Sequence, residues 1–187
     1  DDTTGLEVTE LRQTFSGETD QAYTNTLSDY ATLGYTFVSA EAGATAGTYD
    51  RDDAATQTYT VHLNHGTVVV EGGREDDPNH GSYTSTVTST VHYIYEADNS
   101  TAEPDSVQKK TFTASVTYDA VTGEVVSIVW PTESQNFDDV QTPVIDGYFA
   151  SEGSVAGGAV DYNDASREET ITYIKLGSCI PHVPDLP

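Results

Sequence analysis

The sequence contains an internal duplication, and this feature limits the possible folds more than any other. A shift of 113 positions aligns a segment of the first half with a segment of the second half without a gap. The matched pairs are Gly34 and Gly147, Tyr35 and Tyr148, Tyr49 and Tyr162, Val61 and Ile174, and Leu63 and Leu176. A repeated pattern of about sixty residues indicates two related small domains instead of one large catalytic domain.

A turn of the same type precedes each copy, at residues 1–5 and 119–123, and each ends in Thr-Gly. Before the second turn, residues 110–118 alternate apolar and polar side chains, and residues 125–130 follow it. This pattern predicts a β-hairpin. By analogy, we expect residues 6–15 to be the outgoing half of a hairpin whose first strand is missing or lies outside this chain.

Further elements follow from local patterns in the first copy. Residues 24–33 have a short apolar face, and Gly34 stands at a C-terminal capping position, so a helix is predicted there. Strands are predicted over 35–40 and 57–65. In the second copy Pro143 breaks the corresponding helix or limits it to one turn.

The second copy is longer. A Thr-, Val- and Tyr-rich strand is predicted over 83–96, a polar loop over 97–105 and a closing strand over 169–176. The order of hairpin, helix or turn, strand, loop and strand is typical of a β-grasp-like sheet folded across one short helix. We therefore predict an α+β, mainly β chain with two β-grasp (ubiquitin-like) domains in an elongated tandem.

Domain limits follow from the acidic, glycine-rich stretch near residue 72. We expect a smaller β-grasp-like domain over 1–72, whose first strand is absent or supplied from outside. A larger domain covers 73–178, and a Pro-rich linker covers 179–187.

The charge excludes several classes of partner. The chain has 31 acidic and seven basic residues, for a formal net charge of −24. Nucleic acid is excluded because neutralising phosphates requires Lys and Arg. We predict no direct membrane insertion, because the apolar stretches have only the length of strands. Two explanations of the acidity stay open: solubility of an exported protein, or binding of a cation or a basic partner.

The single cysteine, Cys179, excludes an internal disulfide and offers no redox pair. We expect no catalytic residues, since no nucleophile motif is present and the carboxylates cluster in loops, whereas a general acid needs a buried carboxyl group. The chain is therefore predicted not to be an enzyme.

The ordered set of motifs resembles the mucus-binding (Mub) repeats, with MucBP-type domains, of lactobacillal surface adhesins. The residues that carry the resemblance are the opening turn 1–5, Gly34-Tyr35, Tyr49-Asp50, residues 59–66, Thr122-Gly123, Trp130-Pro131, residues 137–143 and Gly147-Tyr148. The resemblance implies a repeat whose larger domain is MucBP-type. It also implies a secreted protein anchored to the cell wall of a Gram-positive bacterium.

The resemblance further implies adhesion to host mucin glycoproteins. Because mucin glycans are often acidic, we expect weak, multivalent contacts by a monomeric repeat within a tandem array. Two alternatives stay open: a structural spacer in a surface stalk, and binding of a host protein such as a secreted immunoglobulin through an exposed sheet edge.

The candidate ligand sites are few. Asp50, Asp52 and Asp53 crowd one turn and are a calcium candidate, against the alternative of a plain solvated turn. We expect no required cofactor, with Ca²⁺ as the one alternative. The sugar-binding residues are unknown, and several tyrosines could stack on sugars or pack on a sheet face. These tyrosines are Tyr23, Tyr30, Tyr83, Tyr93, Tyr95 and Tyr148.

Overall fold

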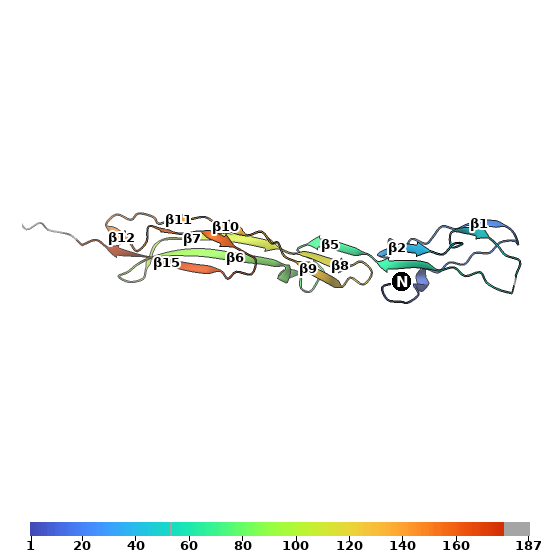
Figure 1. The fold of residues 1–187 in the computed structure, drawn as a ribbon. Helices are drawn as coiled ribbons and strands as arrows, with labels where there is room; N and C mark the ends of the chain where they lie inside the picture. The colour runs from blue at the N-terminus through green and yellow to red at the C-terminus, as the bar shows by residue number, and fades with distance from the viewer. Residues whose placement is uncertain (53, 178–187) are drawn as a thin grey trace, which may run out of the picture. The chain divides into compact units, whose positions relative to one another are not determined.

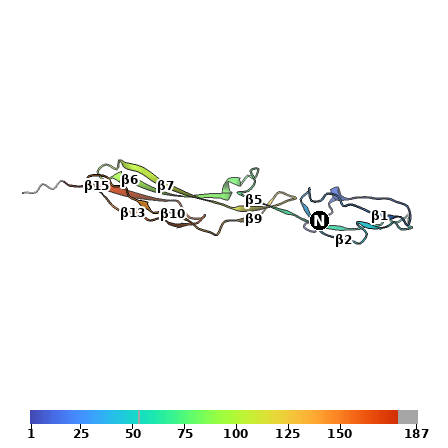
Figure 2. The same cartoon turned by 90° about the horizontal axis from the view of Figure 1, so that it is seen from above.

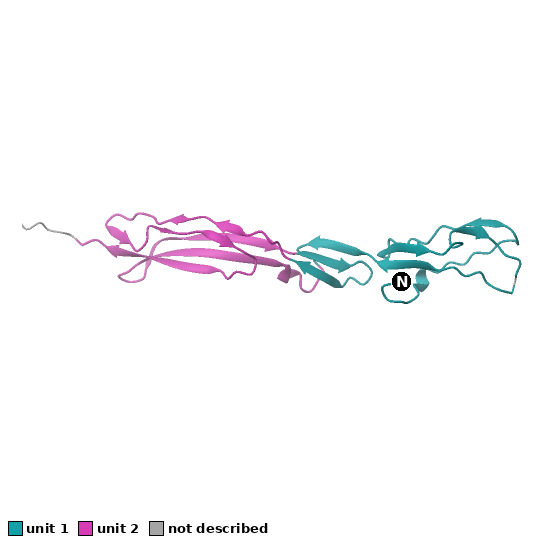
Figure 3. Ribbon diagram, viewed as in Figure 1, with its two compact units in different colours: residues 1–75, 115–129 teal, residues 76–114, 130–187 magenta. Residues whose placement is uncertain are grey.

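The chain folds into two compact units that each combine distant segments. The computed structural model describes residues 1–52 and 54–177. Unit 1 comprises Asp1–Glu75 and Ser115–Val129, and unit 2 comprises Asp76–Ala114 and the chain from Trp130 onward (Figures 1 and 3). The described residues contain no α-helix, and they include no helix that is long and apolar enough to cross a membrane. Two short 3₁₀ helices, η1 (Thr9–Leu11) and η2 (His80–Tyr83), are the helical elements of this part of the chain.

Unit 1 is built from small antiparallel sheets. β1 (Ala22–Thr24) pairs with β3 (Ala46–Thr48), and β2 (Tyr35–Ala40) pairs with β4 (Val61–His65). A three-stranded sheet follows, with β8 (Ser115–Asp119) between β5 (Thr67–Glu71) and β9 (Val125–Val129). The buried apolar residues of unit 1 are Leu63, Val116 and Tyr118.

Unit 2 contains a four-stranded mixed sheet. The strand order is β12 (Tyr148–Ala150), β15 (Arg167–Lys175), β6 (Thr84–Tyr95) and β7 (Thr101–Thr113). The long strands β6, β7 and β15 lie side by side in both views (Figures 1 and 2). The first and last strands, β6 and β15, are parallel neighbours at the centre, and the outer pairings are antiparallel.

Two short strand pairs complete unit 2. They are β10 (Gln135–Phe137) with β14 (Gly158–Val160), and β11 (Val140–Gln141) with β13 (Ser154–Val155). A mainly β chain with two tandem domains confirms the predicted fold class. No α-helix crosses a sheet in the described residues. In unit 2 the two short strand pairs stand in the chain where a β-grasp fold would have its helix.

The core of unit 2 follows from alternation along its strands. In β6, Val87, Val91 and Tyr93 are buried because every second side chain points to the same face. One cluster contains Val87, Phe112, Phe137 and Val160, and a second contains Val91, Tyr93, Ile171 and Tyr173. Trp130 and Tyr162 pack against the first cluster with their rings stacked, 4.8 Å between centroids.

The duplication is visible as two equivalent sets of strand pairs. Ala22 pairs with Thr48 in the first copy, and Gln135 pairs with Val160 in the second. The pair of β2 with β4 corresponds in the same way to the pair of β12 with β15. Each copy of the pattern is therefore two antiparallel pairs in the same chain order.

The closing strands of the two copies, β4 and β15, correspond at a shift of 110 positions and not of 113. Tyr35 lies opposite His65, whereas Tyr148 lies opposite Lys175. Leu63 therefore corresponds to Tyr173, and Val61 corresponds to Ile171. The predicted match to Ile174 and Leu176 is wrong, because those side chains are 41% and 58% exposed while Ile171 and Tyr173 are buried.

The helix predicted over 24–33 does not form. β1 ends at Thr24, and a turn occupies residues 31–34. The intervening backbone bonds to side chains instead: the Gln13 amide donates to the Thr26 carbonyl (2.9 Å) and accepts from the Ser28 N–H (3.2 Å). The Asp29 carboxylate accepts the Thr32 N–H. Such side-chain partners compete with helical hydrogen bonds.

Three other expectations differ from the structure. Residues 6–15 contain η1 and no strand. The predicted polar loop 97–105 is shorter, because β7 begins at Thr101 after a tight turn in which the Asp98 carboxylate accepts the Ser100 N–H (3.0 Å). The strand predicted over 57–65 begins only at Val61. Residues 115–129 pack with unit 1 because β8 pairs with β5, and the domain boundary near residue 72 stays a prediction.

Candidate functional site

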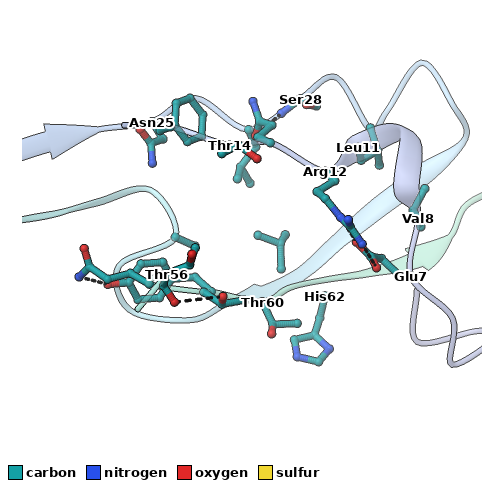
Figure 4. A pocket seen from close by; sticks show the side chains of 18 of the residues that line it. Glu7, Val8, Leu11, Arg12, Thr14, Asn25, Ser28, Thr56, Thr60 and His62 are labelled. Atoms are coloured by element: carbon teal, nitrogen blue, oxygen red, sulfur yellow. Dashed lines mark hydrogen bonds and ion pairs between the residues drawn. The ribbon is translucent and has the colours of Figure 1, made fainter. Parts of the chain in front are cut away.

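Unit 1 contains a cavity of about 990 Å³. Residues 55–63 line one wall, and residues 11–17 with parts of 23–30 line the other. Figure 4 shows Thr14 and Asn25 on one side of the space and Thr56 and Thr60 on the other. One wall comes from the segment between β3 and β4, and the other comes from the segment before β1 and the segment between β1 and β2.

The wall formed by residues 55–63 combines an irregular segment, 55–60, with the first three residues of β4. All nine consecutive residues line the cavity. The edge that pairs with β2 is on the other side, where the Thr60 carbonyl accepts the Glu41 N–H (2.9 Å) and the Thr60 N–H bonds to the Glu41 carboxylate (2.6 Å).

The opening turn covers one end of this wall. The Asp2 N–H donates to the Leu63 carbonyl (2.7 Å), and the His65 N–H donates to the Thr3 hydroxyl (3.0 Å). Toward Tyr59 the same wall borders the cavity. The cavity thus borders residues 55–60 and the start of β4, beyond the point where the turn bonds to Leu63.

The two repeated turns have the same hydrogen bonds. The Gly5 N–H donates to the Asp1 carbonyl (2.8 Å), and the Gly123 N–H donates to the Asp119 carbonyl (2.9 Å). Both glycines have positive φ, 73° and 75°, which a residue with a Cβ rarely adopts. The predicted equivalence of the two turns is confirmed at the level of individual bonds.

His65 joins these two turns. Its Nδ1 lies 2.6 Å from the Asp119 carboxylate, and its Nε2 lies 3.0 Å from the Asp1 carboxylate. The imidazole is 8% exposed. Hydrogen bonding from the Thr122 N–H, with further bonds from His65 and the Val121 N–H, lowers the pKa of Asp119 to about 2. Sequence reasoning identified the turns but missed His65, because no local pattern places it between them.

Aromatic side chains line part of the cavity. Phe15 is 47% exposed and Tyr59 is 38% exposed, so both present ring surface to solvent. The Tyr23 hydroxyl donates to the Gly43 carbonyl (2.7 Å), and a hydrogen bond with Tyr59 raises the pKa of Tyr23 to about 12. The Tyr23 and Tyr49 rings lie 4.9 Å apart. Rings with polar edges of this kind suit sugars and peptide groups alike.

The charge of the lining is negative. Among the described lining residues Arg12 is the only Lys or Arg, and it pairs with Glu7 at 2.5 Å. Asp1, Asp2 and Asp50 also line the cavity. The cavity therefore favours a neutral or basic ligand over an acidic sugar.

The predicted tyrosines divide between the two units. Tyr23 and Tyr30 line the cavity. Tyr83 and Tyr93 are buried, and Tyr95 and Tyr148 pack together with 4.8 Å between ring centroids beside the second core cluster. These four pack on or beside the sheet of unit 2, which is the alternative that alternation on a strand suggests.

The calcium candidate is described only in part. Asp53 lies outside the described residues. The Asp50 carboxylate accepts the Asp52 N–H, and the Asp52 carboxylate accepts the Ala54 N–H, both at 3.0 Å. Within residues 1–52 and 54–177 no group of three or more His, Cys, Asp or Glu is placed to hold a metal ion. Calcium at this turn stays a prediction. Cys179 and the predicted Pro-rich linker 179–187 also lie outside the described residues.

Comparisons with known proteins agree with the two-unit structure. The profile of the Muc B2-like domain matches residues 79–177, and the profile of a mucin binding domain matches residues 1–65. The crystal structure of Mub-RV is 29% identical, with 94% of each chain covered and a TM-score of 0.61. The type 2 repeat of the mucus binding protein MUB from Lactobacillus reuteri is 28% identical, with 86% of this chain and 88% of that chain covered and a TM-score of 0.53.

No curated protein sequence matches the chain. The Muc B2-like profile nevertheless covers more than half of the residues, and the structural matches span both units. The resemblance to mucus-binding repeats is therefore confirmed, and the chain belongs to the Muc B2-like domain family.

Proposed function

We propose that this chain is a mucin-binding repeat of a bacterial surface adhesin. The observation that carries the proposal is the joint match of a mucin binding domain over residues 1–65 and a Muc B2-like domain over 79–177. Two mucus-binding repeats of known structure support it, since both units align with them. These families indicate a binding role at an extracellular or surface location. Anchoring to the cell wall of a Gram-positive bacterium is part of the proposal.

The charge of the chain decides how such binding is achieved. With a net charge of −24 the repeat repels sialylated and sulfated glycans, and at physiological salt this repulsion acts within a screening length of about 8 Å. The negative lining of the cavity in unit 1 has the same effect locally. We therefore infer weak contacts with neutral sugars, in which the exposed rings of Phe15 and Tyr59 stack on sugar faces.

Weak sites become effective when a monomeric repeat is present many times. Linking sites raises the overall affinity by about 10²–10⁴ without any new contact. A single repeat should accordingly bind mucin poorly, and a chain of several repeats should bind strongly. Equal affinity of one repeat and of a multi-repeat chain would contradict this mechanism.

The test is binding to immobilised mucin before and after enzymatic removal of its glycans. Phe15→Ala and Tyr59→Ala should weaken binding of a multi-repeat chain that carries the change in every repeat. Phe149→Ala is the matched control, because Phe149 is 62% exposed in unit 2 and does not line the cavity. Binding that survives deglycosylation would instead favour a protein ligand, such as a secreted immunoglobulin.

A further inference from the structure

We propose that the outer edge of β9 (Val125–Val129) pairs, antiparallel, with the same edge of a second copy of this chain. The inference goes beyond mucin binding and does not rest on it, because the edge lies outside the cavity and its test contains no mucin. Three observations carry it: the edge is exposed and unprotected, its backbone groups face outward, and its sequence is self-complementary.

The exposed edge belongs to a regular strand inside the chain. β9 is an outer strand of the three-stranded sheet of unit 1, and β8 occupies its inner side (Figure 1). All five of its residues are exposed, and Val126 and Val129 reach 59% and 60%. Within residues 1–52 and 54–177 no strand pairs with its outer side. A free apolar edge of this kind is a template for pairing with another chain.

The corresponding edge of unit 2 shows the protection that β9 lacks. The outer strand β7 contains Pro104 and Lys109, both of which oppose pairing with another chain. The Gln108 side-chain amide also donates to the Asp138 carbonyl and accepts the Asp138 N–H, both at 2.9 Å, and so occupies part of that edge. β9 contains neither proline nor charge, and its sequence is Val-Val-Ser-Ile-Val.

The backbone groups at the centre of β9 point away from β8. The Ala120 N–H donates to the Gly66 carbonyl on the β5 side, whereas the Asp119 N–H donates to the Glu124 carbonyl on the β9 side. Because bonding alternates along an antiparallel strand, Thr117 and Ser115 also bond toward β9.

Their partners are Ser127 and Val129, so these two residues use their backbone groups within the sheet. Ile128 lies between them and therefore directs its N–H and C=O to the free edge. Its exposed side chain leaves this edge accessible. Ile128 is thus the natural centre of a new pairing.

The sequence of β9 fits a second copy of itself. With Ile128 opposite the Ile128 of a second copy, the two residues exchange both N–H···O=C bonds. Ser127 then lies opposite Val129 on either side of this pair. No charged side chain of β9 meets another, and the two-fold axis closes the assembly at two chains. A partner edge with the same exposed apolar residues matches it in both chemistry and length.

The strength of this pairing is limited by area and by charge. Five residues bury far less than the roughly 1,200 Å² of a stable complex, so the pairing is weak and the chain stays monomeric in dilute solution. Two copies with a net charge of −24 also repel each other. Raising the salt from 0.1 to 1 M shortens the screening length from about 10 to about 3 Å, and should therefore strengthen the pairing.

Sedimentation equilibrium and NMR spectra of the whole chain provide the test. We expect a monomer at about 0.02 mM, and a monomer–dimer equilibrium at about 1–2 mM that is at least threefold tighter in 1 M than in 0.1 M NaCl. The amide signals of Val125–Val129 should shift with concentration. A monomer under all these conditions, shifts confined to Thr67–Glu71, or growth beyond a dimer would overturn the proposal.

A pair of charge-matched variants separates edge pairing from general association. Ile128→Lys places a charge at the centre of the edge, and Val144→Lys places the same charge at a 93% exposed position of unit 2. Each adds one positive charge to the net −24, so overall repulsion is equal in the two. We expect Ile128→Lys to weaken dimerisation at least tenfold and Val144→Lys to leave it unchanged, with β8 NMR signals reporting an intact unit 1. Equal dimerisation of the two variants would contradict pairing through β9. If Ile128→Lys unfolds unit 1, the concentration-dependent shifts of the native chain decide the question.

Discussion

Asp119→Asn should destabilise unit 1 near neutral pH and have progressively less effect in acid. The Asp119 carboxylate accepts the Val121 and Thr122 N–H groups at 2.8 and 2.9 Å and lies 2.6 Å from His65. These bonds lower its pKa from 3.8 to about 2. At about 1.36 kcal/mol per pKa unit, this corresponds to an upper limit of about 2.4 kcal/mol. Solvent reaches part of the 17% exposed side chain, so we expect about 1–2 kcal/mol.

The sign of the pH dependence follows from the direction of the shift. A carboxyl group whose pKa is lower in the folded state stabilises the fold above its unfolded value of 3.8. That stabilisation disappears as the pH falls through about 2. The difference in unfolding free energy between the native protein and Asp119→Asn should therefore be constant above about pH 5 and should shrink between pH 4 and pH 2.

Urea unfolding at a series of pH values provides the measurement. NMR signals of β5 and β8 report unit 1, and fluorescence of Trp130 reports unit 2 as an internal control. The Trp130 transition of Asp119→Asn should match that of the native protein at each pH. A difference in unit 1 that stays the same from pH 6 to pH 2 would refute the argument, because it would show that the charge of Asp119 does not contribute.

Three substitutions test packing. Gly34→Ala should cost at least about 2 kcal/mol, because φ is +90° and a Cβ would lie 2.4 Å from the Ala120 carbonyl oxygen; unchanged thermal unfolding would contradict this. Phe112→Ala should cost about 3–5 kcal/mol in the core of unit 2, with an earlier Trp130 fluorescence transition in urea. Leu63→Ala should cost only about 2 kcal/mol, since the cavity beside Leu63 already limits its packing; a loss as large as that for Phe112→Ala would show that the cavity is closed in solution.

Local patterns predicted the strands and turns because their causes are local. The alternation of Val87 and Val91 in β6 is sufficient to indicate a strand with one buried face. The turns ending at Gly5 and Gly123 were predictable because Asp and Gly favour the same backbone path in both. A helix was wrongly predicted over residues 24–33 because this segment is shaped by hydrogen bonds to Gln13, which lies outside it. The apolar pattern within the segment contains no sign of these bonds.

The partners of strands were not predictable from the sequence. Alternation shows that residues 115–119 form a strand, but the pairing of Val116 with Val70 depends on a contact between distant segments. For the same reason the sequence did not show that the hairpin 115–129 packs with unit 1. The cavity was missed because its walls come from segments that are distant in the sequence, and local patterns contain no sign of such contacts.

The apolar positions of the two copies differ in how completely they are buried. In the second copy Phe137 and Val160 are buried in one cluster with Val87 and Phe112. In the first copy the paired positions are the exposed Thr24 and Thr48, while Tyr23 and Tyr49 line the cavity with their rings 4.9 Å apart. Leu63 is buried and Val61 is half-buried, so both stay apolar because they pack inside unit 1, as Ile171 and Tyr173 do in unit 2. The first copy therefore has a smaller core than the second, because rings that line a cavity stand where the second copy has packed side chains.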